Sequence, residues 1–142
     1  MSRHRKNSID TGAVLLEGYF QKMGISNTNS WKKRYFRLRQ DPLGRNNLHL
    51  AYYEKEKSKK PKGTIVIGIG SGIRHKIVTG RTHCFELCAE GNIKLISCAP
   101  SRIDCQKWID TISGTIAGWA DEVLTYVLLP PSTSILPRHV TS

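Results

Sequence analysis

Three basic side chains stand where two consecutive β-strands would meet at a turn: Lys22, Lys32 and Arg34. Side chains alternate between the two faces of a strand, and Lys22 falls on the same face as Leu16 and Phe20 of segment 15–22. Lys32 and Arg34 fall in the same way on the apolar face of segment 31–39. A lysine neutralises phosphate as a point charge, and an arginine can hold one in a bidentate fork. The pattern therefore predicts a polyphosphate site at a basic mouth between the first two strands.

The competing interpretation is a solvated hairpin whose lysines only maintain solubility, since lysines are common on protein surfaces. We favour the phosphate site because all three cations share the inward parity. The turn between the two segments adds hydroxyl and amide groups, those of Ser26, Asn27, Thr28 and Asn29.

Positive charge is concentrated in the first part of the chain. The formal net charge is +11, and residues 22–81 include 15 basic residues against three acidic ones. Such polarisation indicates an anionic partner, which is a lipid headgroup, a nucleic acid or an acidic protein. Nucleic acid ranks third, because aromatic side chains are not interleaved on an exposed sheet as stacking on bases requires.

The elements that must hold these side chains are mostly β-strands. The chain of 142 residues is long enough for one hydrophobic core. Turn signals, among them Glu90 and Gly91, separate seven segments rich in β-branched and aromatic residues: 15–22, 31–39, 48–53, 64–70, 73–78, 83–90 and 92–98. This spacing favours a seven-stranded antiparallel barrel or sandwich.

One amphipathic helix follows the strands and is expected to cap them. Ser101 can accept the free amide hydrogens at its start, and Pro130 stops any continuation of the helix. Its apolar positions recur at helical spacing: Cys105, Trp108, Ile109, Ile112 and Ile116. Trp108 is expected to plug the end of the barrel away from the basic mouth.

Four features, in their order along the chain, resemble the pleckstrin homology (PH) domain family. They are EGYFQK, then WKKRYFRL, then AYYEKEKSKKPKGTIVI, and finally a helix that carries Trp108. The resemblance covers about residues 15–113, and it implies a seven-stranded antiparallel barrel capped by a C-terminal helix.

The same resemblance implies a ligand and its contacts. In lipid-binding members of this family, a lysine of the first strand and a basic pair opening the second strand contact inositol phosphates, which corresponds here to Lys22, Lys32 and Arg34. Tyr53 and Lys62 resemble auxiliary headgroup contacts. Members with this pattern often prefer 3-phosphorylated phosphoinositides, so that is the implied ligand class.

A narrower resemblance is to the PH domains that open receptor-substrate docking proteins, which can have a similar long insertion before LHLAYYEKEK. Those proteins continue into a phosphotyrosine-binding domain, and nothing after Leu129 resembles one. We therefore expect a short form, a fragment or an independent small adaptor. Its expected parts are a flexible basic arm over 1–12, a PH-like domain over 13–118 and a partly disordered C-terminal extension over 119–142.

The expected function is a non-catalytic membrane-recruitment module in signalling, with phosphoinositides, the anionic membrane surface and signalling proteins as partners. The alternative is a protein-interaction scaffold of the same fold without specific lipid binding. A cytoplasmic location with peripheral recruitment to the plasma membrane is expected, because no apolar segment follows the basic N-terminus and none is long enough to span a bilayer.

Catalysis, cofactors and metal ions are not expected. The five histidines are scattered over tails and unrelated strands, and the glycine run at 68–72 lacks the spacing of a dinucleotide-binding loop. The spacing of the cysteines fits neither a zinc site nor a redox motif, so we expect reduced and mostly buried thiols. The four cysteines are Cys84, Cys88, Cys98 and Cys105.

Overall fold

The strands and the helix follow the expected order along the chain. A computed structural model of the protein describes residues 12–24, 26 and 30–130. These residues form seven strands and one helix: β1 (Val14–Met23), β2 (Trp31–Gln40), β3 (Leu48–Tyr53), β4 (Gly63–Ile67), β5 (Gly72–His75), β6 (Cys84–Ala89), β7 (Asn92–Cys98) and α2 (Arg102–Leu128). The arm predicted over 1–12 lies outside the described residues except for Gly12, and so does the tail from 131 onward.

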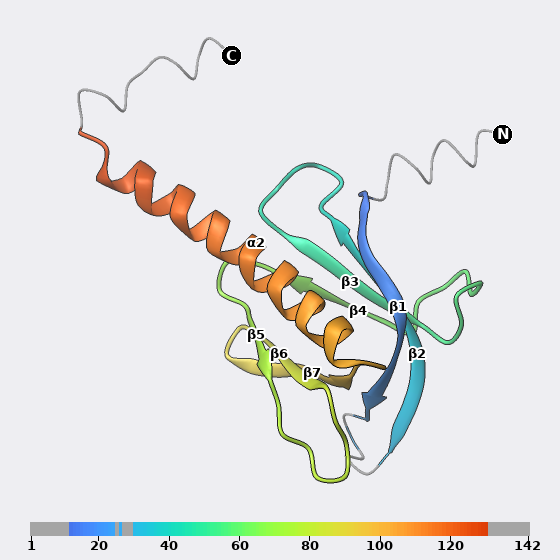
Figure 1. Cartoon of the computed structure of the whole chain (residues 1–142). Coiled ribbons are helices and arrows are strands. Elements are labelled where there is room, and N and C mark those ends of the chain that lie inside the picture. The colour runs from blue at the N-terminus through green and yellow to red at the C-terminus, as the bar shows by residue number, and fades with distance from the viewer. Residues whose placement is uncertain (1–11, 25, 27–29, 131–142) are drawn as a thin grey trace, which may run out of the picture.

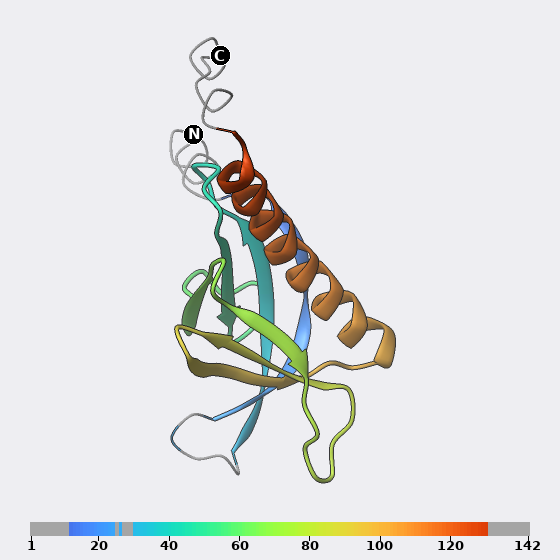
Figure 2. The ribbon, with the colours of Figure 1, turned by 90° about the vertical axis from the view of Figure 1, so that its left-hand side faces the viewer.

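All seven strands belong to one antiparallel sheet with the order β4-β3-β2-β1-β7-β6-β5. The half made of β5, β6 and β7 crosses the half made of β1 to β4, and α2 lies across the opening between them (Figures 1 and 2). The predicted class, a seven-stranded antiparallel PH-type barrel with one C-terminal helix, is therefore confirmed.

The β6–β7 hairpin turns at the two residues where the sequence predicts it. Glu90 has a backbone φ of 56° and Gly91 a φ of 79°, and the flanking residues Ala89 and Asn92 are paired. Two successive positive φ angles are typical of the tight turn whose twist matches that of the flanking strands. Glycine supplies the second of these angles without steric cost.

The core lies between the sheet and α2. The ring centroid of Trp108 is 4.9 Å from that of Phe20 and 6.3 Å from that of Phe36, and all three side chains are buried. The indole is 3% exposed, so it fills the space between the helix and the first two strands.

The helix begins at its predicted cap and runs on for 27 residues. The hydroxyl of Ser101 accepts a hydrogen bond from the backbone N–H of Asp104 at 3.1 Å, which satisfies one of the free amides of the first turn. The helix passes residue 118, the predicted end of the domain, without a break and ends just before Pro130. It is too polar to count as a candidate membrane span, and no such helix occurs among the described residues.

The cysteines differ from expectation at one pair. Cys84 and Cys98 lie directly opposite each other in the β6–β7 ladder and form a disulfide, so the prediction that all four thiols are reduced is wrong for these two. Pairing across a ladder brings side chains together that are 14 residues apart in the chain. Cys88 and Cys105 are free.

Candidate anion-binding site

A small cavity of about 190 Å³ opens between the turn-side ends of β1 and β2. Its lining consists of four basic side chains, one tyrosine and the two residues that flank the turn: Lys22, Lys32, Arg34, Lys62, Tyr52, Gly24 and Ser30. We call this cavity the basic mouth. It brings together every basic residue that the sequence predicts for the headgroup site.

The β1–β2 register explains how three of these cations come to share one face. Lys22 pairs with Lys32, and Phe20, two residues earlier, pairs with Arg34. Paired residues point to the same face of a sheet, and Phe20 is buried in the core. The three cations therefore lie directly above the apolar core, where the barrel opens toward the turn.

Lys62 reaches the mouth through the β3–β4 connection. Its backbone N–H donates a hydrogen bond of 2.7 Å to the carbonyl of Tyr52, and the following residue, Gly63, pairs with Tyr52 in the sheet. Gly63 has no side chain, and a Cβ atom there would overlap the phenol of Tyr52. The glycine therefore leaves the space in which the Tyr52 ring forms one wall of the mouth.

The cations of the mouth contact no acidic side chain in the part of the chain that the structure describes. Among the described residues, no carboxylate lies within 4.0 Å of the charged groups of Lys22, Lys32, Arg34 or Lys62. Burial, and second the charge of Arg34, lower the pKa of Lys22 below its ordinary value. The ammonium of Lys22 lies 4.8 Å from the ring centroid of Tyr52, a partner that carries no charge.

Some basic side chains elsewhere on the barrel have acidic partners. The guanidinium of Arg74 is 2.6 Å from the buried carboxylate of Glu86, and that of Arg45 is 2.9 Å from Asp41. These contacts lower the pKa of both carboxyl groups below their usual range. Arg74 and Arg45 are thus paired within the fold, whereas the four cations of the mouth have positive charge to offer an external anion.

Tyr53, predicted as an auxiliary contact, is not in the mouth. It pairs with Tyr35, and both rings lie 5.0 Å from the guanidinium carbon of Arg37 on the outer face of the sheet. Tyr52 takes the inward position instead, opposite Phe36. The alternation of the third strand contains this information, because Leu48 and Leu50 mark its buried face and Tyr52 shares their parity.

The outer face is held by its own polar contacts. The Tyr35 hydroxyl donates a hydrogen bond of 2.9 Å to Glu17, and Arg37 donates to the same carboxylate at 3.2 Å. Burial, and second the bond to Glu17, raise the pKa of Tyr35 to about 12.

The hydroxyl and amide groups predicted for the turn lie outside the described residues, except for the exposed Ser26.

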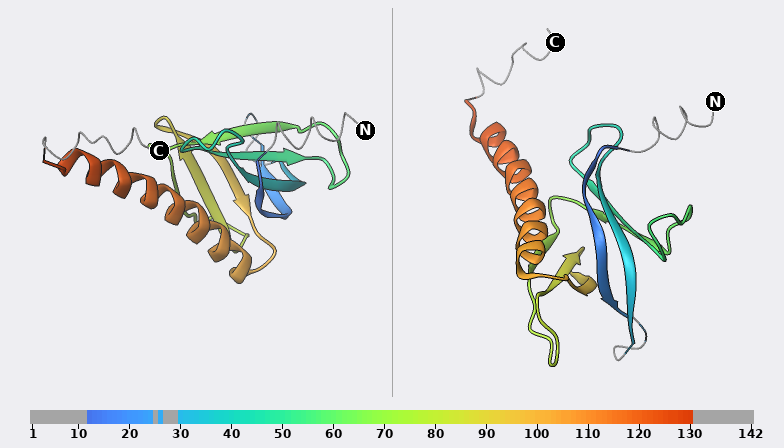
Figure 3. Two further views of the ribbon diagram at one scale, coloured as in Figure 1. Left: turned by 90° about the horizontal axis from the view of Figure 1, so that it is seen from above. Right: turned by 45° about the vertical axis from the view of Figure 1, so that its right-hand side comes forward.

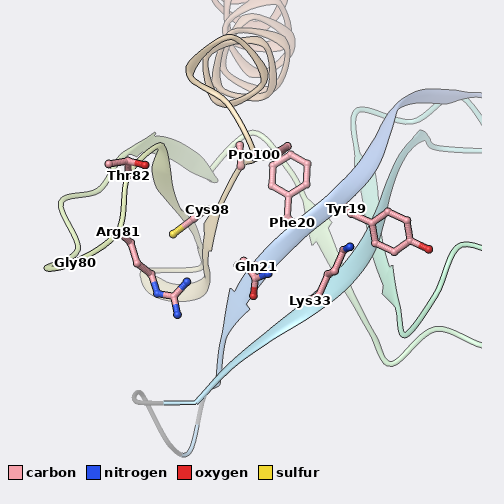
Figure 4. A pocket seen from close by; sticks show the side chains of 10 residues that line it. Tyr19, Phe20, Gln21, Lys33, Gly80, Arg81, Thr82, Cys98 and Pro100 are labelled. Atoms are coloured by element: carbon pink, nitrogen blue, oxygen red, sulfur yellow. The ribbon is translucent and has the colours of Figure 1, made fainter.

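A larger hollow of about 520 Å³ lies on the other side of the β1–β2 hairpin (Figure 4). Its cations are Lys33, 4.8 Å above the ring of Tyr19, and Arg81, whose guanidinium is 4.0 Å from the centroid of Trp31. Figure 4 shows Lys33 and Arg81 on opposite sides of the hollow. No sequence pattern singled out this hollow, because Lys33 has the outward parity.

Comparison with protein families gives one match over most of the chain. The PH domain model matches residues 14–117, which include every strand and the part of α2 that covers the sheet.

Two curated relatives match at lower identity. Src kinase-associated phosphoprotein 1 of Homo sapiens is 29% identical over 115 residues, which is 76% of this chain and 30% of the relative. The Rho GTPase-activating protein gacFF of Dictyostelium discoideum is 24% identical over 110 residues, which is 70% of this chain and 12% of the relative. The chain therefore spans less than a third of the length of either protein.

Solved structures show the same fold. The C-terminal PH domain of pleckstrin, in complex with D-myo-Ins(1,2,3,5,6)P5, matches with a TM-score of 0.62 and 24% identity. The match covers 75% of this chain and 98% of that one. The crystal structure of the same pleckstrin domain at 2.1 Å matches with a TM-score of 0.60, also at 24% identity, over 74% of this chain and 98% of that one.

Proposed function

Because the chain belongs to the PH domain family, we propose that it is a non-catalytic membrane-recruitment module that binds a phosphoinositide headgroup in the basic mouth. The observation that carries this proposal is the convergence of Lys22, Lys32, Arg34 and Lys62 on one cavity, with no acidic partner among the residues that the structure describes. Several unpaired cations over an apolar core are costly to the free protein, since like charges repel and burial disfavours them. A polyphosphate relieves that cost when it binds.

The chemistry of the mouth suits an inositol phosphate. Lysine ammonium groups neutralise phosphate oxygens from several directions, and the fork of Arg34 can hold two oxygens of one phosphate. The comparison structure of pleckstrin is a complex with an inositol pentakisphosphate, and it supports this ligand class for a domain of the same fold. We propose a 3-phosphorylated phosphoinositide as the ligand in this chain.

The mouth is a better site for this ligand than the hollow in Figure 4, although the hollow is larger. The mouth has four cations on its lining and the hollow has two, Lys33 and Arg81. Each additional charge-assisted contact adds about 1.5–3 kcal/mol, so the number of cations decides between the two.

Recruitment to the plasma membrane follows from the same geometry. With a headgroup in the mouth, the basic loop between β3 and β4 lies on the membrane side, because its last basic residue, Lys62, lines the mouth. Each further Lys or Arg near an anionic leaflet adds about 1 kcal/mol of nonspecific attraction. The headgroup provides specificity, and the loop strengthens the association with the surface.

The test compares two adjacent lysines on opposite faces of β2. Lys32→Ala removes a charge from the mouth, whereas Lys33→Ala removes one from the outer face. Binding is measured by titration with vesicles that contain a 3-phosphorylated phosphoinositide, and with vesicles in which phosphatidylserine provides the same charge. We expect Lys32→Ala to weaken the phosphoinositide-specific part by about tenfold or more, the equivalent of 1.4 kcal/mol.

Lys33→Ala should weaken binding to both kinds of vesicle by the same small factor, because it removes only nonspecific attraction. If the two substitutions weakened the phosphoinositide-specific part of binding equally, the mouth would be refuted as the site. A larger effect of Lys33→Ala, shared by Arg81→Ala, would transfer the site to the hollow in Figure 4. Absence of any selectivity for phosphoinositide would refute the lipid function itself.

A further inference from the structure

The apolar stripe of α2 continues beyond the sheet that it covers. An α-helix has 3.6 residues in each turn, so residues 18 positions apart lie at the same angle, five full turns along. Three apolar residues near the C-terminal end of the helix lie at the same angles as three buried residues near its N-terminal end. The buried residues are Cys105, Trp108 and Ile109, and their counterparts are Val123, Tyr126 and Val127.

The two sets differ sharply in exposure. Trp108 is 3% exposed, whereas its counterpart Tyr126 is 64% exposed, and Val123 and Val127 are 48% and 68% exposed. Figures 1 and 3 show why, because α2 runs past the edge of the sheet and its last turns have no strand beneath them. The part that matches the PH domain family ends at residue 117, so these turns lie outside it.

The same turns carry only negative charge. From residue 109 to the end of the helix there are three acidic residues, Asp110, Asp121 and Glu122, and no basic one. The C-terminal end of a helix also carries a partial negative charge, which basic residues in the last turn usually offset, and α2 has none there. This acidic end contrasts with the net charge of +11 on the whole chain.

A second copy of this chain does not suit the stripe. Three side chains that bury at most about 150–250 Å² each fall short of the roughly 800 Å² per partner of a stable interface. The occupant therefore needs an additional attraction. Two copies that pair through the stripe would bring Glu122 of one helix close to the acidic end of the other, and this repulsion opposes pairing.

An anionic membrane is an equally poor occupant. Figures 1 and 2 both place the end of α2 and the turn-side ends of β1 and β2 at opposite ends of the molecule. Glu122, which borders the stripe, would moreover face a leaflet of its own sign.

We propose that the end of α2 binds a basic amphipathic helix of a partner protein. The apolar face of that helix covers Val123, Tyr126 and Val127, and its lysines or arginines lie beside Glu122, which is about 40° around the helix from Tyr126. Two helices that pack in this way contact each other through residues three and four positions apart, which is the spacing of the exposed stripe. Because this surface is remote from the basic mouth, membrane docking and partner binding are compatible.

The test uses a fluorescently labelled synthetic peptide of leucine and lysine, with the leucines on one face of the helix, and the full chain. Fluorescence anisotropy measures its dissociation constant. We expect Val123→Ser combined with Val127→Ser to weaken binding at least tenfold. The matched control is Leu128→Ser, which removes an equally exposed side chain about 140° around the helix from Val123 and should change affinity less than twofold.

The charge part is tested separately with Glu122→Lys, which leaves the stripe intact and should also weaken binding at least tenfold, whereas Asp121→Lys on the opposite face of the helix should have a smaller effect. A peptide with glutamate in place of lysine should bind the native chain at least tenfold more weakly and should regain affinity for the Glu122→Lys variant. Equal binding of the two peptides to the native chain would overturn the proposal. So would a native chain that sediments as a dimer and becomes monomeric on loss of Val123 and Val127.

Discussion

Lys22→Met should remove headgroup binding without lowering the stability of the fold. Lys22 lies opposite Lys32 in the β1–β2 ladder and beside Arg34, and its pKa is lowered by burial first and by the charge of Arg34 second. A lowered lysine pKa means that the charged form of the side chain lowers the stability of the folded protein. This loss of stability disappears only at alkaline pH, where the lysine is deprotonated. Methionine keeps the length of the half-buried side chain and removes the charge.

The magnitudes of the separate effects nearly cancel. Like charges directly opposite each other cost about 0.2–1 kcal/mol, which the substitution recovers. Loss of the contact between the ammonium and the Tyr52 ring costs about 0.5–1 kcal/mol. A methionine sulfur beside the same ring returns about 0.3–1.5 kcal/mol. The free energy of unfolding should therefore change by between about −0.5 and about +2 kcal/mol, with a midpoint near +0.75 kcal/mol, so Tm should not fall by more than about 4 °C.

The assay is thermal unfolding with and without the soluble headgroup of a 3-phosphorylated phosphoinositide. A ligand at 100 times its Kd stabilises the native protein by about 2.7 kcal/mol. If Lys22→Met weakens binding tenfold, the stabilisation at the same concentration falls to about 1.4 kcal/mol, so the ligand-induced shift in Tm should be roughly halved or smaller.

Lys33→Met is the matched control, since Lys33 also lies 4.8 Å from a tyrosine ring centroid but on the outer face. It should keep the full ligand-induced shift. The reasoning is refuted if Lys22→Met lowers Tm by more than about 4 °C in the absence of ligand, because the side chain would then contribute more than about 1 kcal/mol to the fold. An undiminished ligand-induced shift in Lys22→Met would equally refute it.

Three further predictions concern the fold. Trp108→Ala should lower the free energy of unfolding by about 3–5 kcal/mol in urea denaturation, because it empties the centre of the core, and a loss under 1 kcal/mol would contradict this packing. The pKa of Asp41 is lowered mainly by its bond to Arg45, so its contribution to stability should be complete above pH 4 and lost as the pH falls further. The Tm difference between the native chain and Asp41→Asn should accordingly shrink below about pH 4, and a constant difference would exclude the ion pair as its cause. Under non-reducing denaturation, two of the four cysteines should react with a thiol reagent, since Cys84 and Cys98 are bonded, and all four should react after reduction.

Local patterns in the sequence were enough to predict the strands and the helix. The strand segments are separated by turn residues, and positions such as Gly91 tolerate a backbone conformation that few other residues adopt. The start of α2 follows from the hydroxyl of Ser101, which accepts a hydrogen bond from the backbone N–H of Asp104 in the first turn of the helix. These features depend on neighbours in the chain, so they can be predicted without knowing the fold.

The mouth was predictable to the extent that alternation along a strand decides it. Lys22, Lys32 and Arg34 share one face because each lies an even number of residues from a buried apolar side chain. The same reasoning applied to the third strand would have selected Tyr52 over Tyr53, because Leu50 marks the inward face.

Other features depend on contacts between distant segments. The disulfide between Cys84 and Cys98 requires the register of the β6–β7 ladder, which spacing in the chain does not reveal. The hollow in Figure 4 likewise forms only when the segment that contains Arg81 comes close to the outer face of β1 and β2.

The sequence alone therefore determined the type and order of the elements and the face on which each basic side chain of the first hairpin points. Periodicity and turn chemistry are local, and they act before any long-range contact forms. For Lys62 the sequence offered only a family resemblance, and the tertiary structure shows how it joins the other three cations, since the β3–β4 connection brings it there. It also decided which part of the α2 stripe is covered, because the helix is longer than the sheet beneath it.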